Sequence, residues 1–255
     1  MTDLNDIDHT TDDFLGGIVR LHQPRRGYRV AMDTVLLAAS LELKPGERVL
    51  DVGAGTGGIL TCLAGRLGDD SSDLTLHGIE LQPLHVLFAR ENAALNGFDD
   101  RIRYFEGDIV APPETCEKNS YHHVVSNPPY YEKGMHTASP QENRALAHTG
   151  SHLSLADWIS CCLKMVRPRG YLSLIQKADR LDDILSALQG KAGEVVVFPV
   201  WPDDCGDAGR VIVRTRKDSR APLALKRGLV VHKSEGGYTD RAEAVLRHGQ
   251  KLTIA

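Results

Sequence analysis

The tetrapeptide Asn127-Pro128-Pro129-Tyr130 holds the residues best suited to chemistry in this 255-residue chain. An amino group conjugated to a ring or to a carbonyl is a poor nucleophile, because its lone pair is delocalised. The side chain of Asn127 and the carbonyl of Pro128 could each accept one of its hydrogens, which would free the lone pair for attack. The two prolines stiffen the turn that holds these acceptors, and Tyr130 offers a ring face on which a planar group can stack. The tetrapeptide therefore predicts catalysis at a planar exocyclic nitrogen, with a proline-terminated strand as the plain alternative.

The glycine-rich stretch Asp51–Gly57, with the pattern D-x-G-x-G-x-G, predicts a ligand-binding turn between a strand and a helix. Glycines allow such a turn to bend tightly and to approach a ligand without interference from a Cβ atom. The loop is one residue shorter than the dinucleotide pattern G-x-G-x-x-G, so it lacks room for a pyrophosphate but suits a methionine group and a ribose. A glycine turn without a ligand remains the alternative. The residues assigned to this ligand are Asp51, Gly53, Ala54, Gly55 and Gly57.

Two further acids follow at the ends of later apolar runs. Glu80, with Leu81 beside it, could accept hydrogen bonds from both hydroxyls of a ribose. Asp108 could accept from the exocyclic amine of an adenine ring, while the backbone amide of Ile109 faces a ring nitrogen. A surface acid is the alternative for Glu80, and a helix N-cap is the alternative for Asp108. These acids predict a ligand that contains a nucleoside, and Asn127 is expected to face the same ligand.

Short apolar runs alternate with segments of helical periodicity, which is typical of an α/β fold with a mostly parallel sheet. The expected strands cover residues 48–52, 74–79, 101–106, 122–126, 171–175, 194–200 and 210–216. The expected helices cover residues 59–67, 83–96, 155–166 and 179–188. The four sites fall at the C-terminal ends of the first four strands, where an open parallel sheet has its ligand crevice. The last two strands have no helix between them, so we expect them to form an antiparallel hairpin.

The net charge of −4 is distributed unevenly along the chain. Residues 1–13 carry five acids and no Lys or Arg, whereas residues 205–255 carry 11 Lys and Arg against five acids. On alternating strand positions, Arg210, Arg214 and Arg216 would share one face and could contact phosphates, with a solvated hairpin as the alternative. The basic charge therefore favours the C-terminal part as a contact with nucleic acid.

The remaining features exclude several classes of protein. The chain has no run of about 18 apolar residues and no Cys/His cluster with metal-ligand spacing, so we expect no membrane span and no metal. Its five cysteines form no C-x-x-C pair, which indicates free thiols and a cytoplasmic location. The segment after the tetrapeptide could cover the acceptor with Tyr131, Arg144 and His148, although these residues could equally be solvated.

In this order the four sites resemble those of the class I S-adenosylmethionine-dependent methyltransferases that carry the amino-methyltransferase tetrapeptide. Over roughly Arg20 to Gly249, the chain is similar to the bacterial tRNA1(Val) adenine-37 N6-methyltransferase family. The segments that carry this closer likeness are Tyr28–Ala39, Ser126–Tyr131 with Gly134 and Pro140 after it, and Tyr238–Val245.

The resemblance implies a Rossmann-like fold, with a mostly parallel seven-stranded sheet, an antiparallel last strand and helices on both faces. It implies S-adenosylmethionine as the methyl donor and an adenine in RNA as the acceptor, at position 37 in the anticodon loop of tRNA(Val). By position, Asp51, Gly53, Gly55, Glu80 and Asp108 would hold the cofactor. Asn127 to Tyr130 would hold the base.

We expect residues 1–19 to form an acidic, flexible tail before a single methyltransferase domain at 20–255. Within the domain, 20–45 would be a helical extension, 46–217 the core sheet and 218–255 a C-terminal extension. Adenine in ribosomal RNA and a protein glutamine amide remain alternative acceptors. A non-catalytic RNA-binding module is a further alternative, while the short glycine loop and the tetrapeptide disfavour a nicotinamide or flavin oxidoreductase.

Overall fold

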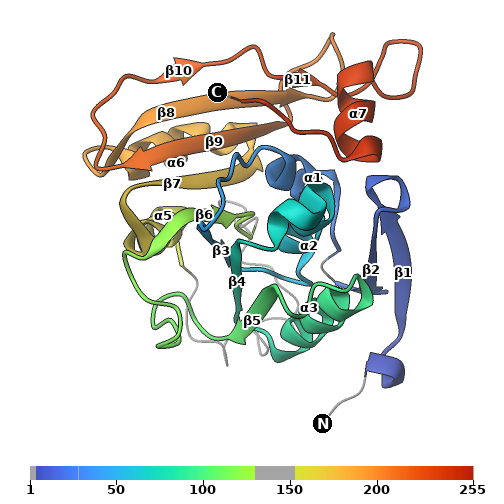
Figure 1. The fold of residues 1–255 in the computed structure, drawn as a ribbon. Coiled ribbons are helices and arrows are strands. Elements are labelled where there is room, and N and C mark those ends of the chain that lie inside the picture. Colours follow the sequence, from blue (N-terminus) through green and yellow to red (C-terminus); the bar gives the residue numbers. More distant parts are fainter. Residues whose placement is uncertain (1–3, 28, 130–152, 255) are drawn as a thin grey trace, which may run out of the picture.

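The computed structural model describes residues 4–27, 29–129 and 153–254 (Figure 1). Its described strands form a nine-stranded sheet in the order β10-β8-β9-β7-β6-β3-β4-β5, with β11 also paired to β8, and a separate two-stranded sheet. The seven longer strands of the large sheet are β3 (Arg48–Val52), β4 (Thr75–Glu80), β5 (Ile102–Glu106), β6 (Tyr121–Ser126), β7 (Val166–Lys177), β8 (Ala192–Trp201) and β9 (Arg210–Lys217). The two short strands are β10 (Ala224–Leu225) and β11 (Leu229–Val230). Among the described strands of the large sheet, only β9 runs antiparallel to its neighbours, β7 and β8. β9 is the last of the seven longer strands along the chain, so the expected antiparallel last strand is confirmed.

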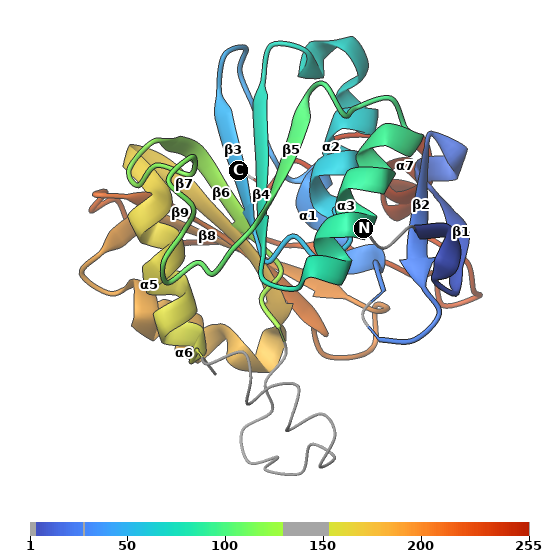
Figure 2. The same cartoon turned by 90° about the horizontal axis from the view of Figure 1, so that it is seen from below.

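Helices cover both faces of the sheet (Figure 2). One face packs against α1 (Met32–Ala39), α2 (Gly58–Leu67), α3 (Pro83–Leu95) and α7 (Asp240–His248). The other face packs against α5 (Leu155–Met165) and α6 (Leu181–Leu188). Side chains alternate between the two faces of a strand, and Val49 and Leu50 of β3 accordingly lie in different core clusters. Within the described part of the chain, no helix is long and apolar enough to cross a membrane.

The register of the parallel strands brings their C-terminal ends to one edge of the sheet. Val52 of β3 pairs with Ile79, and Glu80 of β4 pairs with Glu106, the last residue of β5. Asp51 also pairs with Val125 of β6. The turns that follow these strands therefore lie side by side, as the sequence predicted.

The start of β7 differs from the expected strand 171–175. Val166 pairs with Tyr121, but the next paired residue, Tyr171, lies opposite His123. The intervening residues around Arg169, which has a φ of 64°, bulge out of the ladder. Residues 167–170, between the expected helix and the expected strand, therefore form a bulge within a longer strand.

Residues 9–19, which the sequence assigned to a flexible tail, are ordered instead, because β1 (His9–Phe14) pairs antiparallel with β2 (Val19–Pro24). Two of the acids bind arginines that follow later in the chain. Asp8 lies 2.6 Å from Arg25, and Asp12 lies 2.5 Å from Arg29. The segment 20–45 is likewise only partly helical, since it contains β2 as well as α1.

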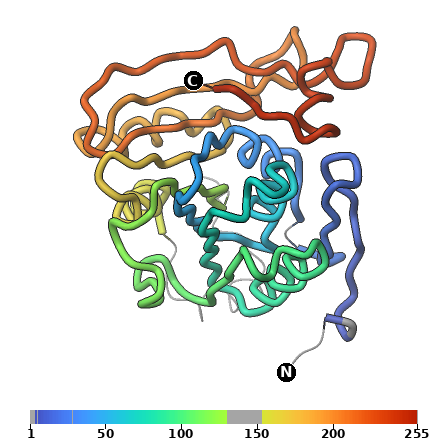
Figure 3. Tube along the Cα trace, viewed as in Figure 1, coloured from blue at the N-terminus to red at the C-terminus, as the bar shows by residue number. Residues whose placement is uncertain are grey.

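The hairpin lies beside α3 (Figure 3). Asn92 of α3 and Asn96, the C-cap of the helix, hold it there. The side-chain amides of Asn92 and Asn96 both donate to and accept from the backbone of β2, at His22 and Arg20 respectively. Asn92 Nδ2 also donates to the carbonyl of Thr56, in the glycine loop, at 2.9 Å. The hairpin is therefore connected to the crevice edge through one buried side chain.

Candidate active site

A cavity of about 240 Å³ lies at the C-terminal edge of β3, β4, β5 and β6. Seven of the residues that the sequence assigned to the cofactor line it: Gly53, Gly55, Glu80, Leu81, Asp108, Ile109 and Asn127. Its described lining contains the acids Glu80 and Asp108 but no Lys or Arg. An acidic cavity disfavours the pyrophosphate of a dinucleotide and suits a ligand that carries positive charge, such as a sulfonium.

The glycine loop is pinned to the end of β4 by its backbone. The amides of Gly53 and Ala54 both donate to the carbonyl of Ile79, at 2.9 and 3.0 Å. Gly53 has a φ of +72°, and a Cβ atom at this position would lie 3.0 Å from the ring of Trp158. Glycine is therefore required here both by the backbone conformation and by the close packing of the indole.

Glu80 is nearly buried, and its carboxylate holds the glycine loop in place. Its Oε2 accepts from the amide of Gly55 at 2.8 Å, and its Oε1 accepts from the amide of Gln82 at 2.9 Å. A carboxylate offers about four acceptor positions, so Glu80 retains the capacity to bind ribose hydroxyls. The imidazole of His85 also lines the cavity, with Nδ1 3.9 Å from Glu80 Oε1. Burial lowers the pKa of His85, although the charge of Glu80 opposes this effect.

Asp51 lies behind the glycine loop and is not among the residues that line the cavity. Its side chain is fully buried, and neither carboxylate oxygen has a hydrogen-bond partner among the described residues. Burial raises the pKa of Asp51 well above its usual range, and the negative charge of Glu80 adds to the effect. The structure thus places Asp51 as a buried acid close to the site, while Ala54 and Gly57 support the loop from outside the lining.

Asp108 caps a turn and not a helix. Its Oδ1 accepts from the amide of Val110 at 2.9 Å, and no helix lies between β5 and β6 in the described chain. The helix N-cap considered for Asp108 is therefore wrong. Ile109 is buried beside it and contributes to the cavity wall.

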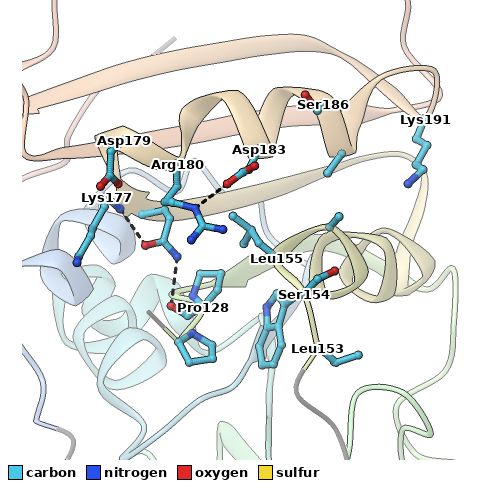
Figure 4. Close-up of a pocket in the computed structure, with 15 residues that line it drawn as sticks. Pro128, Leu153, Ser154, Leu155, Lys177, Asp179, Arg180, Asp183, Ser186 and Lys191 are labelled. Carbon is cyan, nitrogen blue, oxygen red and sulfur yellow. Dashed lines mark hydrogen bonds and ion pairs between the residues drawn. The ribbon is translucent and has the colours of Figure 1, made fainter. Parts of the chain in front are cut away.

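The turn after β6 separates this cavity from a second one of about 950 Å³, which lies between α5 and α6 (Figure 4). Asn127 lines the smaller cavity, Pro128 lines the larger one, and Pro129 lines both. The carbonyl of Pro128 accepts from Nε2 of the buried Gln176 at 3.4 Å. The other predicted acceptor-side residues, Tyr130, Tyr131, Arg144 and His148, lie outside the described residues.

Trp158 is a site residue that the sequence analysis missed. Its indole Nε1 donates to Ser126 Oγ at 3.0 Å, and Ser126 Oγ donates to the carbonyl of Val52 at 2.7 Å. Trp158 lines both cavities, so one hydrogen-bonded chain joins their shared wall to the ends of β6 and β3. We expected site residues at the ends of strands, whereas Trp158 lies in the first turns of α5 after the N-cap Ser154.

The three arginines of β9 share one face as predicted, but they do not lie together at the site. Arg210 is at the crevice edge, where its Nε donates to Asp33 at 2.7 Å. Arg216 pairs across from Tyr171 near the opposite edge, six residues or roughly 20 Å along the strand. The guanidinium groups of Arg214 and Arg216 lie 5.3 and 5.4 Å from the centre of the Tyr171 ring. A phosphate contact by Arg214 and Arg216 stays a prediction, and its place would be beside Tyr171.

The sequence pattern of the N-6 DNA methylase family matches residues 31–185, which is more than half of the chain. The tRNA1(Val) (adenine(37)-N6)-methyltransferase of Aeromonas hydrophila is 32% identical over 227 residues, covering 85% of this chain and 88% of the relative. The protein of the same name from Dickeya chrysanthemi is 29% identical, with 88% of each chain covered.

Solved structures show the same fold. A predicted O-methyltransferase from Agrobacterium tumefaciens superposes with a TM-score of 0.71 at 24% identity, covering 87% of this chain and 98% of that one. A tRNA (m1A58) methyltransferase from Aquifex aeolicus gives a TM-score of 0.53 at 14% identity, covering 77% and 72%. The chain therefore belongs to the N6-methylase family and, within it, to the family of the bacterial tRNA1(Val) (adenine(37)-N6)-methyltransferases.

Proposed function

We propose that the protein methylates N6 of an adenine in RNA, and that this adenine is nucleotide 37 of tRNA1(Val). The observation that carries the proposal is the position of the Asn127–Pro129 turn between two adjoining cavities. The smaller cavity suits the methyl donor, and the larger cavity leaves room for the RNA that carries the adenine. The names of the similar proteins support the choice of tRNA over ribosomal RNA or a glutamine side chain.

The residues of the smaller cavity fit S-adenosylmethionine. Glu80 would accept from the ribose hydroxyls, and Asp108 would accept from the adenine amine, with Ile109 against the ring. Gly53 and Gly55 leave their backbone open to the ligand, since no Cβ atom intervenes. When bound, S-adenosylmethionine supplies an electrophilic methyl group on a positively charged sulfur.

The acceptor nitrogen would be activated by hydrogen bonding. Asn127 Oδ1 and the carbonyl of Pro128 would each accept one N–H of the adenine amine, which draws the nitrogen toward tetrahedral geometry and exposes its lone pair. Gln176 donates to the same Pro128 carbonyl, and this bond fixes the direction of the carbonyl while one lone pair stays available for the amine. The acceptors are thus preorganised, so activation requires no base with a tuned pKa. The proton of the cationic product leaves after transfer.

We further propose that the enzyme works in the cytoplasm. All five cysteines are free thiols, and four of them are buried (Cys62, Cys116, Cys161 and Cys162). Reduced thiols are typical of that compartment, where tRNA is modified.

Replacing Asn127 by Ala tests the mechanism. Loss of one preorganised hydrogen-bond partner in the transition state costs about 10²- to 10³-fold in kcat. Cofactor affinity should change much less, because Glu80, Asp108 and the glycine loop remain. The measurements are single-turnover methylation of tRNA and calorimetric binding of S-adenosylhomocysteine. Turnover equal to that of the wild type would contradict the mechanism.

A further inference from the structure

We propose that the groove between α5 and α6 binds the single-stranded RNA next to the target adenine, with Arg180 and Lys191 contacting its phosphates. This inference rests on the proposed function, because it takes RNA as the acceptor. It adds the path of the strand and the side chains that hold it.

This groove is the larger of the two cavities, and it continues directly from the Asn127–Pro129 turn, the catalytic turn. It begins at Pro128 and passes Ser154, the N-cap of α5, and Ser186 of α6 before it reaches Lys191 (Figure 4). Pro129 also lines it. Its volume is about 950 Å³, against about 240 Å³ for the cofactor cavity, so it has room for more than the base. An adenine that has been extruded into an active site stays bonded to its neighbours. The adjoining nucleotides must therefore leave the catalytic turn along a surface that starts there, as this groove does.

Cationic side chains stand at both ends of the groove. Lys177 and Arg180 lie near the catalytic turn, whereas Lys191 lies at the far end of α6 (Figure 4). Arg180 Nε pairs with Asp183 at 2.7 Å. Lys191 is exposed, and its Nζ donates to Ser160 Oγ at 3.0 Å, across the gap between the two helices. Both cations are thus held by neighbouring side chains in positions that border the groove.

The lining also contains groups that suit the edges of unpaired bases. Asp179 and Asp183 can accept from the amino groups of cytosine, adenine or guanine, and Ser154 and Ser186 can either donate or accept. Phosphate contacts fix the position of a strand, and base contacts add selectivity. A groove with both kinds of group matches an unstacked strand better than the regular phosphate rows of a duplex.

The arginines that the sequence favoured for RNA binding lie elsewhere. Arg216 lies near the opposite edge of the sheet, Arg214 lies midway along β9, and the guanidinium groups of both pack on Tyr171. Arg216 also lies 3.3 Å from Glu194, and neither arginine is among the residues that line the groove. The groove is therefore the better site for the strand beside the adenine.

The test compares two double variants that remove the same charge. Arg180→Gln with Lys191→Gln alters the groove, whereas Arg103→Gln with Lys118→Gln removes two exposed cations from β5 and from the loop before β6. Fluorescence anisotropy at several KCl concentrations would measure binding of the tRNA1(Val) anticodon stem-loop to the full chain with S-adenosylhomocysteine. Because each lost phosphate contact on a single strand lowers the salt slope by about 0.7, the groove variant should lose about 1.4. The double variant Arg103→Gln with Lys118→Gln should keep the wild-type salt slope.

Steady-state methylation and cofactor binding complete the test. The groove variant should raise KM for the RNA more than it lowers kcat, and its affinity for S-adenosylhomocysteine should match that of the wild type. Equal salt slopes and equal KM values for the two double variants would overturn the proposal that this groove binds RNA. If the wild type is normally active in that case, the proposed function still holds. A wild type that methylates no adenine in the stem-loop or in full-length tRNA would overturn the proposed function, and the groove with it.

Discussion

Trp158→Phe tests whether the wall between the two cavities is held by the hydrogen-bonded chain from Trp158 through Ser126 to Val52. Phenylalanine keeps an aromatic ring in the wall and removes the indole N–H, which donates to Ser126 Oγ at 3.0 Å. One such hydrogen bond contributes about 1 kcal/mol to the free energy of unfolding. If the same bond holds the wall during transfer, the methyl-transfer rate should fall about fivefold, because 1.36 kcal/mol corresponds to a factor of ten.

The assay combines urea unfolding with single-turnover methylation at saturating cofactor and RNA, on Trp158→Phe, Ser126→Ala and the double variant. The two single changes should couple by about 1 kcal/mol, since each removes the same bond. Trp201→Phe is the matched control: its Nε1 donates to the carbonyl of Arg227 at 3.1 Å, outside both cavities. That variant should lose a similar amount of stability and keep the wild-type transfer rate. Additive effects of the two site changes, or an unchanged rate in Trp158→Phe, would show that this bond does not hold the wall during transfer.

Two further predictions concern stability. Burial lowers the pKa of His77 to about 4, with smaller effects from nearby arginines, and its Nδ1 lies 2.8 Å from the hydroxyl of Tyr121. The unfolded chain therefore binds more protons between pH 6.5 and 4, so stability should be complete above pH 6.5 and should fall by less than about 3 kcal/mol as the pH approaches 4. Urea unfolding at several pH values should show a smaller loss in His77→Gln, and identical pH dependence in the two proteins would disprove this cause. Asn92→Ala should cost about 3 kcal/mol, because this fully buried amide makes three hydrogen bonds, two to His22 and one to Thr56. A urea midpoint within error of the wild type would show that the hairpin is held by other contacts.

The crevice could be predicted from the sequence because its residues follow directly after strands. Glycine, proline and acidic residues end each apolar run, and the ends of parallel strands must meet at one edge. β3 has the predicted bounds, and Glu80 and Asn127 lie where the strand order required. Local patterns were therefore enough to bring the cofactor residues together.

Other parts of the site depend on how distant segments return to the crevice. Trp158 and Gln176 reach it from α5 and from the end of β7, and neither position carries a motif. The alternation along β9 predicted which arginines share a face, but it could not show that Arg214 and Arg216 pack on the ring of Tyr171, with Arg216 near the opposite edge of the sheet. The charge of residues 1–13 likewise suggested unpaired acids, but the β1–β2 hairpin brings Asp8 beside Arg25, which lies outside that segment.

Methylation of N6 of adenine 37 in tRNA1(Val) can be tested by incubating the full chain with labelled S-adenosylmethionine and an unmodified tRNA1(Val) transcript. Ribosomal RNA and a release factor would be incubated in parallel reactions. Nuclease digestion and mass spectrometry would then locate the methyl group. We expect one N6-methyladenosine, at position 37, which is lost when adenine 37 is replaced by guanine. A methyl group on another nucleotide, on a glutamine amide of the release factor, or on none of these substrates would contradict it.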